Sequence, residues 1–270
     1  MTDIPLDLPA LLVMALDAAR AAASLVEKGW RQRPESDHKR ARVDLVTRFD
    51  RESESLLRAT LGRATPFAIV GEEEGGEPAR GAHAPTWYVD PLDGTTNFVH
   101  GHPFWCVSIG LLAGLDPVLG VVVAPSLGIE WTAFSGSRAR RNGEECRVSD
   151  VATLDDALLA TGFPYDRHTS ADNNFDAFVA IKRKCQAVRR CGSAAIDLCL
   201  VADGTYDGYW EKKLGSWDVA AGSAIVLAAA GRLTDYAGLP ADLARGNVVA
   251  TNGRIHDELV AELGAVTSRD

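Results

Sequence analysis

The sequence lacks the cysteine and histidine patterns of a zinc site or a disulfide-rich domain. Its cysteines form no C-x-x-C pair and their number is odd: Cys106, Cys146, Cys185, Cys191 and Cys199. Several lie in apolar or helical contexts, so buried free thiols are expected rather than disulfides or a thiolate metal centre. No His/Cys cluster is visible, and His100 and His102 are expected to be structural or peripheral.

Positive charge is also scarce. The chain has 28 Lys and Arg against 37 Asp and Glu, which gives a net charge of −9 and a pI near 5.2. This balance argues against nucleic acid or an anionic membrane as the main partner. Long apolar runs are absent as well, because Asp17 and Arg20 interrupt the alanine- and leucine-rich residues 10–26. Neither a signal peptide nor a membrane span is predicted, and a cytoplasmic protein is expected.

The order of apolar patterns predicts an α/β (α+β) protein. A length of 270 residues fits one large domain or two closely packed halves. Residues 1–150 are predicted to form an N-terminal α+β half and residues 151–270 a C-terminal α/β half, together one compact unit. Helices are predicted over residues 8–28, 44–61, 170–184, 193–202, 217–230 and 255–263. Strands are predicted over residues 67–70, 87–89, 106–113, 118–124, 129–134, 157–161, 188–191, 206–211, 232–236 and 247–250, with a hairpin over 138–148.

One strand runs into two acids, and this motif is the centre of the sequence. The apolar residues 87–89 predict a strand that enters the core, and Pro91 is expected to end it at Asp90. Asp90 and Asp93 would then lie three residues apart on a stiff loop. Residues 95–97 are N-cap types that favour a short helix with its N–H groups toward an anion. An ordinary Asp-Gly turn is the competing interpretation.

Two further acids extend the motif into a candidate metal site. Glu72 follows the strand at 67–70, and the other acids of that run are predicted to lie in a mobile surface loop. Asp218 opens an otherwise apolar helix, where a carboxylate either complements the helix dipole or binds a metal. The all-oxygen set that Mg²⁺ prefers would consist of Glu72, Asp90, Asp93, Asp218 and the carbonyl of Leu92. Lys39, Asp44, Thr47 and Asp50 are further candidates, although Asp44 or Thr47 equally fits a helix cap.

The spacing of the two acids separates two phosphatase chemistries. An Asp-x-Asp-Gly-Thr motif would indicate an aspartyl-phosphate enzyme, but two residues lie between Asp90 and Asp93. A metal-activated water is therefore the better nucleophile, because paired ions can acidify water, orient a phosphate and neutralise the leaving oxygen. The sequence predicts a metal-dependent phosphomonoesterase.

These motifs resemble the signatures of the inositol monophosphatase family. Residues 90–98 (Asp-Pro-Leu-Asp-Gly-Thr-Thr-Asn-Phe) and 217–222 (Trp-Asp-Val-Ala-Ala-Gly) are similar to its two signatures. Residues 71–73 resemble its acidic loop, and residues 44–47 with Asp50 resemble its N-terminal element. The resemblance implies a layered αβαβα sandwich of the inositol monophosphatase and fructose-1,6-bisphosphatase type. It also implies Mg²⁺-dependent hydrolysis of a phosphate monoester, lithium inhibition and a homodimer.

The resemblance implies a role for each site residue. The catalytic residues would be Glu72, Asp90, Asp93, Thr95, Asp50 and Asp218. About two or three Mg²⁺ ions would bind, the first at Glu72, Asp90 and the Leu92 carbonyl, the second at Asp90, Asp93 and Asp218, and a weaker third at Glu72. Thr95, linked to Asp50, would help to activate water, and Lys39 would lie near the acids. The substrate-binding residues would be Gly94, Thr95, Thr96, Gly192, Ser193, Ala194, Glu211 and Asp218.

The substrate is predicted from Glu211, which the resemblance places on sugar hydroxyls. A carboxylate that accepts two vicinal hydroxyls suits a polyol, so inositol-1-phosphate is the leading substrate. Lys212 and Lys213 follow directly and are either solvated or favour a more anionic substrate. Histidinol phosphate, fructose-1,6-bisphosphate and a 3′-phosphonucleotide are the alternatives. A regulatory binding role, for example on the transcription machinery as in some bacterial relatives, also stays open.

Overall fold

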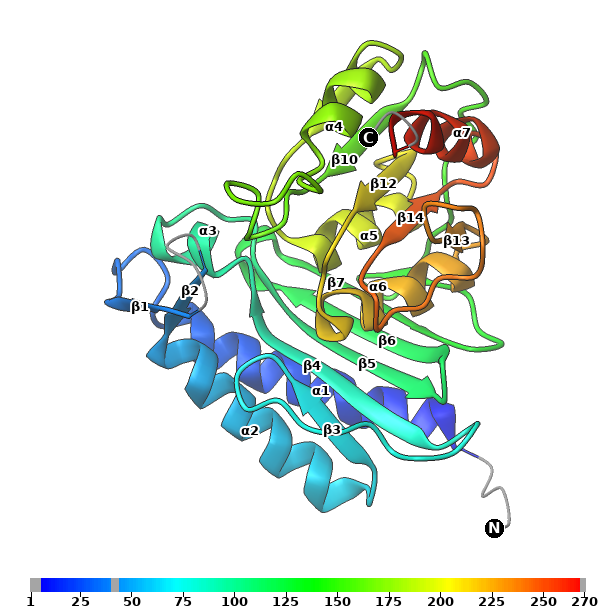
Figure 1. Cartoon of the computed structure of the whole chain (residues 1–270). Coiled ribbons are helices and arrows are strands. Elements are labelled where there is room, and N and C mark those ends of the chain that lie inside the picture. The colour runs from blue at the N-terminus through cyan, green and yellow to red at the C-terminus, as the bar shows by residue number, and fades with distance from the viewer. Residues whose placement is uncertain (1–5, 40–43, 268–270) are drawn as a thin grey trace.

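The computed structural model describes residues 6–39 and 44–267, which form five stacked layers of helices and sheets (Figure 1). A seven-stranded sheet and a five-stranded sheet are the two β layers. The outer helices on the larger sheet are α1 (Leu8–Glu27) and α2 (Arg48–Ala64). Between the sheets lie α5 (Ala194–Ala202) and α6 (Ser216–Ala228). The smaller sheet is covered on its other face by α4 (Phe175–Lys182) and α7 (His256–Thr267).

The larger sheet is mostly an antiparallel meander, as predicted. Its strands follow the order β3-β4-β5-β6-β7-β8-β9, and only the β3–β4 pair is parallel. The strands are β3 (Ala68–Gly71), β4 (Pro85–Asp93), β5 (Cys106–Ala113), β6 (Asp116–Ala124), β7 (Ile129–Phe134), β8 (Arg140–Arg141) and β9 (Glu144–Glu145). A 3₁₀ turn, η1 (Pro125–Leu127), joins β6 to β7, and the short helix α3 (Thr95–Val99) follows β4.

The smaller sheet is mixed, with the order β11-β10-β12-β14-β13. Its strands are β10 (Leu158–Thr161), β11 (Ala187–Arg189), β12 (Gly208–Glu211), β13 (Arg232–Thr234) and β14 (Val248–Thr251). The central strand β12 runs parallel to β10 and antiparallel to β14. A separate hairpin of β1 (Ser36–His38) and β2 (Leu45–Thr47) precedes α2.

Small residues let the outer helix α1 approach the larger sheet closely. Its buried face consists of Ala15, Ala18, Ala19, Ala22, Ala23 and Val26, which join one core cluster with α2 and the sheet. By length and composition alone, α1 is apolar enough to cross a membrane. In the structure, α1 instead packs against β6 and α2 and contributes its buried face to a hydrophobic core.

Glycines have the same function on the other face of the sheet. A Cβ atom on Gly120 of β6 would lie 2.2 Å from the carbonyl oxygen of Ala221, and one on Gly110 of β5 would lie 2.6 Å from the Cβ of Ala220. The backbone of α6 therefore packs directly on β5 and β6. This contact fixes the position of α6, whose first turn carries Asp218.

The structure corrects the predicted end of the motif strand. β4 does not stop at Asp90 but runs through Pro91 to Asp93. Asp90 pairs with Ser108 and Asp93 pairs with Cys106, so β4 uses one residue more than β5 between the two pairs. Such a bulge accommodates a proline, which has no N–H to give to the ladder. The two acids lie on an irregular strand end rather than on a loop.

Other boundaries also differ from the predictions. Helix α4 begins at Phe175, not near Ser170, because Asn174 adopts a positive φ of 70° and its side chain bonds back to Gly162. The Asp116-Pro117 pair begins β6 rather than forming a turn. The hairpin of β1 and β2 was not predicted, since its residues are mostly polar; residues 40–43 of that segment lie outside the described residues.

Candidate active site

The site begins at the junction of β4 and α3. Asp90 is 1% exposed, and its Oδ1 accepts a hydrogen bond from the Leu92 N–H at 3.0 Å. Gly94 follows with φ of 92°, and a Cβ there would lie 2.8 Å from the carbonyl oxygen of Phe104. Only glycine fits that turn. Gly94 therefore forms the turn between Asp93, the last residue of β4, and Thr95, the first residue of α3.

Asp93 joins the two halves of the chain. Its Oδ2 accepts hydrogen bonds from Ser193 Oγ at 2.7 Å and from the N–H of Ala195 at 2.8 Å. Ser193 is also the N-cap of α5. The segment predicted to contact substrate, Gly192 to Ala194, is therefore brought to the acidic motif, but the Ser193 hydroxyl serves Asp93. Burial raises the pKa of Asp93 to about 6, although Ser193 and Ala195 oppose the shift.

The structure links Thr95 to Asp50, as the resemblance implies. Thr95 Oγ1 lies 2.9 Å from Asp50 Oδ1 and 3.1 Å from the carbonyl oxygen of Leu92. Asp50 is fully buried and also accepts bonds from the N–H and hydroxyl of Thr47, at 2.7 and 2.6 Å. The bond from the Thr47 N–H is one half of the capping box of α2, in which the Thr47 side chain in turn accepts the backbone N–H of Asp50. Helix capping thus holds Asp50 rigidly against Thr95.

The acidic loop after β3 lies on the surface from Glu74 onward, as predicted, but Glu73 is held inward. Lys39 Nζ lies 2.8 Å from Glu72 Oε1 and 2.5 Å from Glu73 Oε1, and the side chains of these acids are 15% and 8% exposed. The fully buried Glu54 of α2 accepts the N–H groups of Glu73 and Glu74 at 2.7 and 3.0 Å. Neither Glu54 nor the role of Glu73 was predicted. A carboxylate inside an amphipathic helix pattern gives little sign that it faces inward.

Lys39 and the loop acids shift one another's pKa values. Burial lowers the pKa of Lys39, but Glu72 and Glu73 raise it by more, so the ammonium keeps its charge. Burial raises the pKa of Glu72 to about 7 despite the opposing charge of Lys39. Lys39 therefore lies beside the acidic set, as predicted.

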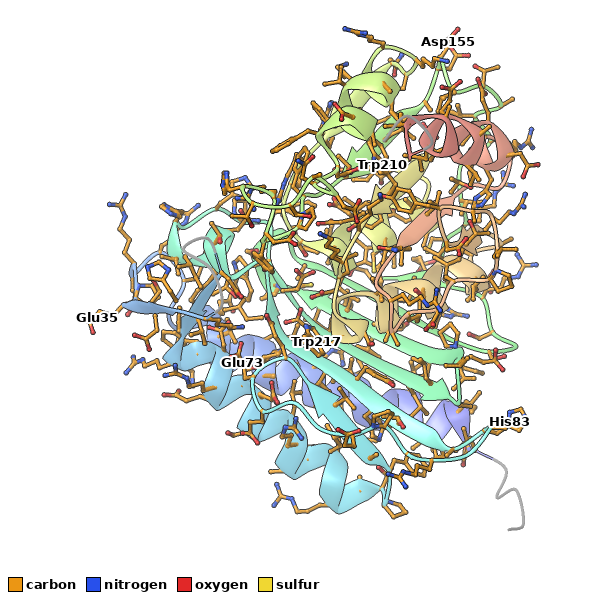
Figure 2. The ribbon with its side chains drawn as sticks, in the orientation of Figure 1. Glu35, Glu73, His83, Asp155, Trp210 and Trp217 are labelled. Carbon is orange, nitrogen blue, oxygen red and sulfur yellow. The ribbon has the colours of Figure 1, made fainter. Side chains whose placement is uncertain are left out.

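Asp218 and Glu211 come from the C-terminal half. Asp218, in the first turn of α6, accepts the N–H of Gly215 at 2.5 Å. Burial, followed by the charges of Glu72 and Asp93, raises the pKa of Asp218 well above its usual value. Glu211 ends β12, and its Oε2 accepts the hydroxyl of Tyr209 at 2.5 Å, while burial raises its pKa to about 7. Figure 2 labels Trp210 and Trp217, which directly precede these two acids in the chain, and Glu73 on the acidic loop.

The mutual repulsion of the acids indicates a cation site. Burial raises the pKa of Asp90 well above its usual value, and the charges of Glu72, Asp93 and Asp218 add to the shift. Within residues 6–39 and 44–267, no three acidic, His or Cys side chains are already arranged as a cage around an ion. The donors are oxygens only, which suits a hard cation. A bound cation would relieve the repulsion among the buried carboxylates.

The remaining predicted residues lie around this acidic centre. Thr96 is exposed on α3, and Ala194 begins α5. Asn97 Nδ2 bonds to the carbonyl oxygens of Phe104 and Cys191 at 2.7 and 2.8 Å, which holds α3 against the turn at Gly192. The structure therefore gathers the predicted phosphate and substrate segments on one side of the motif.

Lys212 is mostly buried, whereas Lys213 is exposed as expected for a solvated lysine, and each forms an ion pair within the chain. Lys212 Nζ lies 2.6 Å from Asp172 Oδ1, and Lys213 Nζ lies 2.8 Å from Asp166 Oδ2. Each ammonium group therefore already has a carboxylate partner within the chain. A preference for a more anionic substrate therefore has no support at these two residues.

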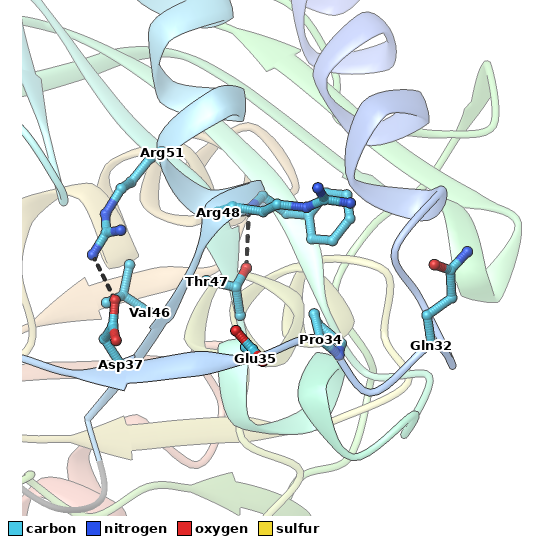
Figure 3. Close-up of a pocket in the computed structure, with 9 residues that line it drawn as sticks. Gln32, Pro34, Glu35, Asp37, Val46, Thr47, Arg48 and Arg51 are labelled. Carbon is cyan, nitrogen blue, oxygen red and sulfur yellow. Dashed lines mark hydrogen bonds and ion pairs between the residues drawn. The ribbon is translucent and has the colours of Figure 1, made fainter.

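A separate cavity of about 400 Å³ lies beside the β1–β2 hairpin and the start of α2 (Figure 3). Its lining is Gln32, Pro34, Glu35, Asp37, Val46, Thr47, Arg48, Phe49 and Arg51. It shares Thr47 with the support of Asp50 but includes none of the four predicted metal acids. We therefore place the site at the acids and not in this cavity.

Comparisons with known proteins agree with this geometry. The pattern of the Inositol monophosphatase family matches residues 7–268. An inositol-1-monophosphatase of Synechocystis is 42% identical over 97% of this chain and 91% of its own length. A Nus factor SuhB of Pseudomonas aeruginosa is 38% identical over 94% of this chain and 95% of its own. The structure of an inositol monophosphatase from Anabaena (Nostoc), 38% identical, superposes with a TM-score of 0.88 over 97% of this chain and 98% of that one. The chain belongs to the inositol monophosphatase family, a family of metal-dependent phosphatases with this layered α+β fold.

Proposed function

We propose that the protein is a Mg²⁺-dependent phosphomonoesterase that releases phosphate from a small polyol phosphate, with inositol-1-phosphate as the leading substrate. The observation that carries the proposal is the buried acidic set, in which burial and then the charges of Glu72 and Asp93 raise the pKa values of Asp90 and Asp218. Glu72, Asp90 and the Leu92 carbonyl would hold one ion, and Asp90, Asp93 and Asp218 a second. When bound, Mg²⁺ would acidify a water and neutralise the leaving oxygen.

The residues of this chain position the reactants. Asp50 accepts the hydroxyl proton of Thr95, so the lone pairs of Thr95 Oγ1 are turned toward an attacking water. The N–H groups of Gly94 and Thr95, at the start of α3, would bind phosphate oxygens. The buried Asp50 stays fixed by Thr47, so this orientation exists before substrate binds.

Glu211 supports the polyol part of the proposal. One of its oxygens already accepts the Tyr209 hydroxyl, and burial, with a smaller contribution from the charge of Asp93, raises its pKa to about 7. Vicinal hydroxyls donate well to such a carboxylate. Histidinol phosphate, fructose-1,6-bisphosphate and a 3′-phosphonucleotide are the alternative substrates. We also propose lithium inhibition, a homodimer and a cytoplasmic location.

Phosphate release across a substrate panel tests this function. Inositol-1-phosphate, histidinol phosphate, fructose-1,6-bisphosphate and adenosine 3′,5′-bisphosphate would each be assayed with Mg²⁺, with EDTA, and with Mg²⁺ plus Li⁺. We expect turnover that needs Mg²⁺, falls with Li⁺ and is fastest for inositol-1-phosphate. Turnover that persists in EDTA would contradict the metal assignment, and a different preferred compound would replace the substrate.

A regulatory binding role is the second candidate. It is favoured by the 38% identity to a protein named a Nus factor. A binding role would not need the chemistry of the acids. Pull-downs from the native cell with the wild type and with Asp93→Asn would then recover the same partner, whereas the absence of any stable partner would count against this role.

A further inference from the structure

Residues 162–174, which connect β10 to α4, form a loop that is closed at its base. Asn174 Nδ2 donates to the carbonyl oxygen of Gly162 at 2.6 Å and lies 3.0 Å from Thr161 Oγ1. Asn174 Oδ1 in turn accepts the indole N–H of the buried Trp210 at 3.0 Å. The two ends of the 162–174 loop are therefore tied to each other and to β12, the strand that ends in Glu211.

Two lysines directly after Glu211 fasten the body of the same loop. Lys213 Nζ lies 2.8 Å from Asp166 Oδ2 and 2.9 Å from Ser170 Oγ, and Lys212 Nζ lies 2.6 Å from Asp172 Oδ1. Lys212 is only 14% exposed and also lies 4.9 Å from the centre of the Tyr236 ring. Surface pairs of this kind are individually weak, but several contacts to one short loop act together.

The backbone at Lys213 shows that its position matters. Its φ is 59°, a left-handed value that costs a non-glycine residue about 1 kcal/mol or more. The Asn247 side chain accepts the N–H of Lys213 at 3.2 Å and helps to hold this conformation. A lysine here is explained by its side-chain contacts to Asp166 and Ser170 rather than by the turn, which glycine would form more easily.

The loop lies directly over Glu211 and holds Tyr165 close to that acid. A Cβ on Gly162 would lie 1.9 Å from Glu211 Oε2, so the backbone rests on that carboxylate. Tyr165 follows three residues later and is 55% exposed. Burial, followed by the charges of Glu72 and Asp218, nevertheless raises the pKa of its hydroxyl well above its usual value. Gly162 lies against Glu211 and Asp166 is bonded to Lys213, so the loop holds Tyr165, between them, beside the predicted substrate-binding acid.

We propose that the 162–174 loop is a fixed wall of the active site, held by Lys212 and Lys213, and that it presents the Tyr165 hydroxyl to the alcohol part of the substrate. This inference rests on the proposed function. A phenol at this place would donate to or accept from a substrate hydroxyl, and it would discriminate polyol phosphates from phosphates without hydroxyls. Lys212 and Lys213 are then positioning residues, since they act through the loop.

The first test compares inositol-1-phosphate with p-nitrophenyl phosphate, whose aryl group has no free hydroxyl. For Tyr165→Phe we expect KM for inositol-1-phosphate to rise about fivefold, the loss of one hydrogen bond, with kcat little changed. KM for p-nitrophenyl phosphate should stay constant. Equal KM ratios for the two compounds would overturn the role of Tyr165.

The second test removes the lysine contact without backbone strain. Lys213→Gly suits the left-handed φ, so the variant should fold, and it should raise KM for inositol-1-phosphate as Tyr165→Phe does. The double variant should show about the same rise as either single variant, since both remove one interaction. Lys184→Ala, which breaks a comparable ion pair with Glu262 on α7, is the matched control and should leave both KM values unchanged.

A measurement independent of turnover separates this inference from the proposed function. In Lys213→Gly, amide hydrogen exchange at Arg167 and Thr169, whose N–H groups bond within the loop, should be about fivefold faster than in the wild type. Unchanged exchange would overturn the fastening by Lys213, whether or not the enzyme turns over. A wild type that is inactive toward both phosphates would overturn the proposed function and the substrate role of Tyr165, leaving the fastening to be decided by exchange.

Discussion

Asp93 has two physical functions that compete with each other. Burial raises its pKa to about 6, while Ser193 and Ala195 donate hydrogen bonds that favour the ionised form. The same two bonds connect the β4 motif to the start of α5. The residue therefore contributes to assembly of the site and, without a cation, destabilises it electrostatically.

Asp93→Asn separates these two functions. We expect phosphate release to fall about a hundredfold or more, because an amide supplies no charge to the metal site. Without metal, the variant should be more stable than the wild type at neutral pH. The folded-state pKa of Asp93 is raised from 3.8 to about 6, so wild-type stability is lost as pH rises through this interval. Urea unfolding in EDTA should therefore show a difference in unfolding free energy between variant and wild type that is near zero at pH 4 and reaches its full size above pH 6. Phosphate release at the wild-type rate in the variant would refute the assignment of Asp93 as a metal ligand.

Glu211→Gln is the corresponding test of substrate choice. The amide keeps one acceptor for Tyr209 but loses the charge that attracts vicinal hydroxyls. We expect kcat/KM for inositol-1-phosphate to fall about tenfold, the value of a charge-assisted hydrogen bond, while kcat changes less. Glu144→Gln, on the exposed strand β9, is the control. An unchanged order of preference across the four-compound panel would remove Glu211 from recognition.

At this scale the site residues that the sequence predicts are those that lie in short, ordered motifs. Asp90, Asp93 and Thr95 are adjacent in the chain, and Asp218 lies in a second motif, so the resemblance was sufficient. Glu54 and the proposed role of Tyr165 were not predicted, since each depends on packing between segments that are distant in the sequence. Their local patterns, an acid within a helix and an aromatic residue in a loop, are common and carry no chemical signal.

Among the elements, α6 and the sheet beneath it are the least tolerant of added volume. Its backbone lies against Gly110 and Gly120, so the sheet and the helix are in contact without intervening side chains. Because α6 begins with the turn that carries Asp218, any displacement of the helix moves a predicted metal ligand.

Gly120→Ala should therefore reduce both stability and activity. The added Cβ would lie 2.2 Å from the Ala221 carbonyl oxygen, and overpacking of this kind costs about 1–3 kcal/mol. Thermal unfolding and Mg²⁺-dependent phosphate release would measure the two effects. Gly264→Ala in α7 adds a Cβ with no neighbour within 4 Å and should be neutral or slightly stabilising. Equal behaviour of the two variants would contradict the close contact.

The order of elements was predicted well because apolar periodicity is local. Ends of elements were predicted less well, since they depend on partners elsewhere. Pro91 was expected to stop β4, but a bulge against β5 carries the strand on to Asp93. Helix α4 begins later than predicted because the Asn174 side chain bonds to Gly162, the residue that follows β10. Neither partner can be inferred from the residues around the boundary.

On the scale of the whole molecule, the two predicted halves meet at the acidic site. The N-terminal half supplies Glu72, Asp90 and Asp93, and the C-terminal half supplies Asp218 and the donors from α5 to Asp93. A core cluster of residues from both sheets and from α5 and α6 also crosses this boundary. We therefore expect the halves to unfold together, in a single cooperative transition.

Mg²⁺ should stabilise that single transition because its predicted ligands come from both halves. At a concentration of about 100 times Kd, binding adds about 2.7 kcal/mol, which for a chain of this size raises Tm by roughly 5–10 °C. Differential scanning calorimetry with Mg²⁺ and with EDTA would measure the shift. Asp218→Asn should lose most of it, whereas Asp257→Asn, an exposed acid paired with Arg232, should keep it. Two separate transitions, only one of which responds to Mg²⁺, would mean that the ion is held by one half alone.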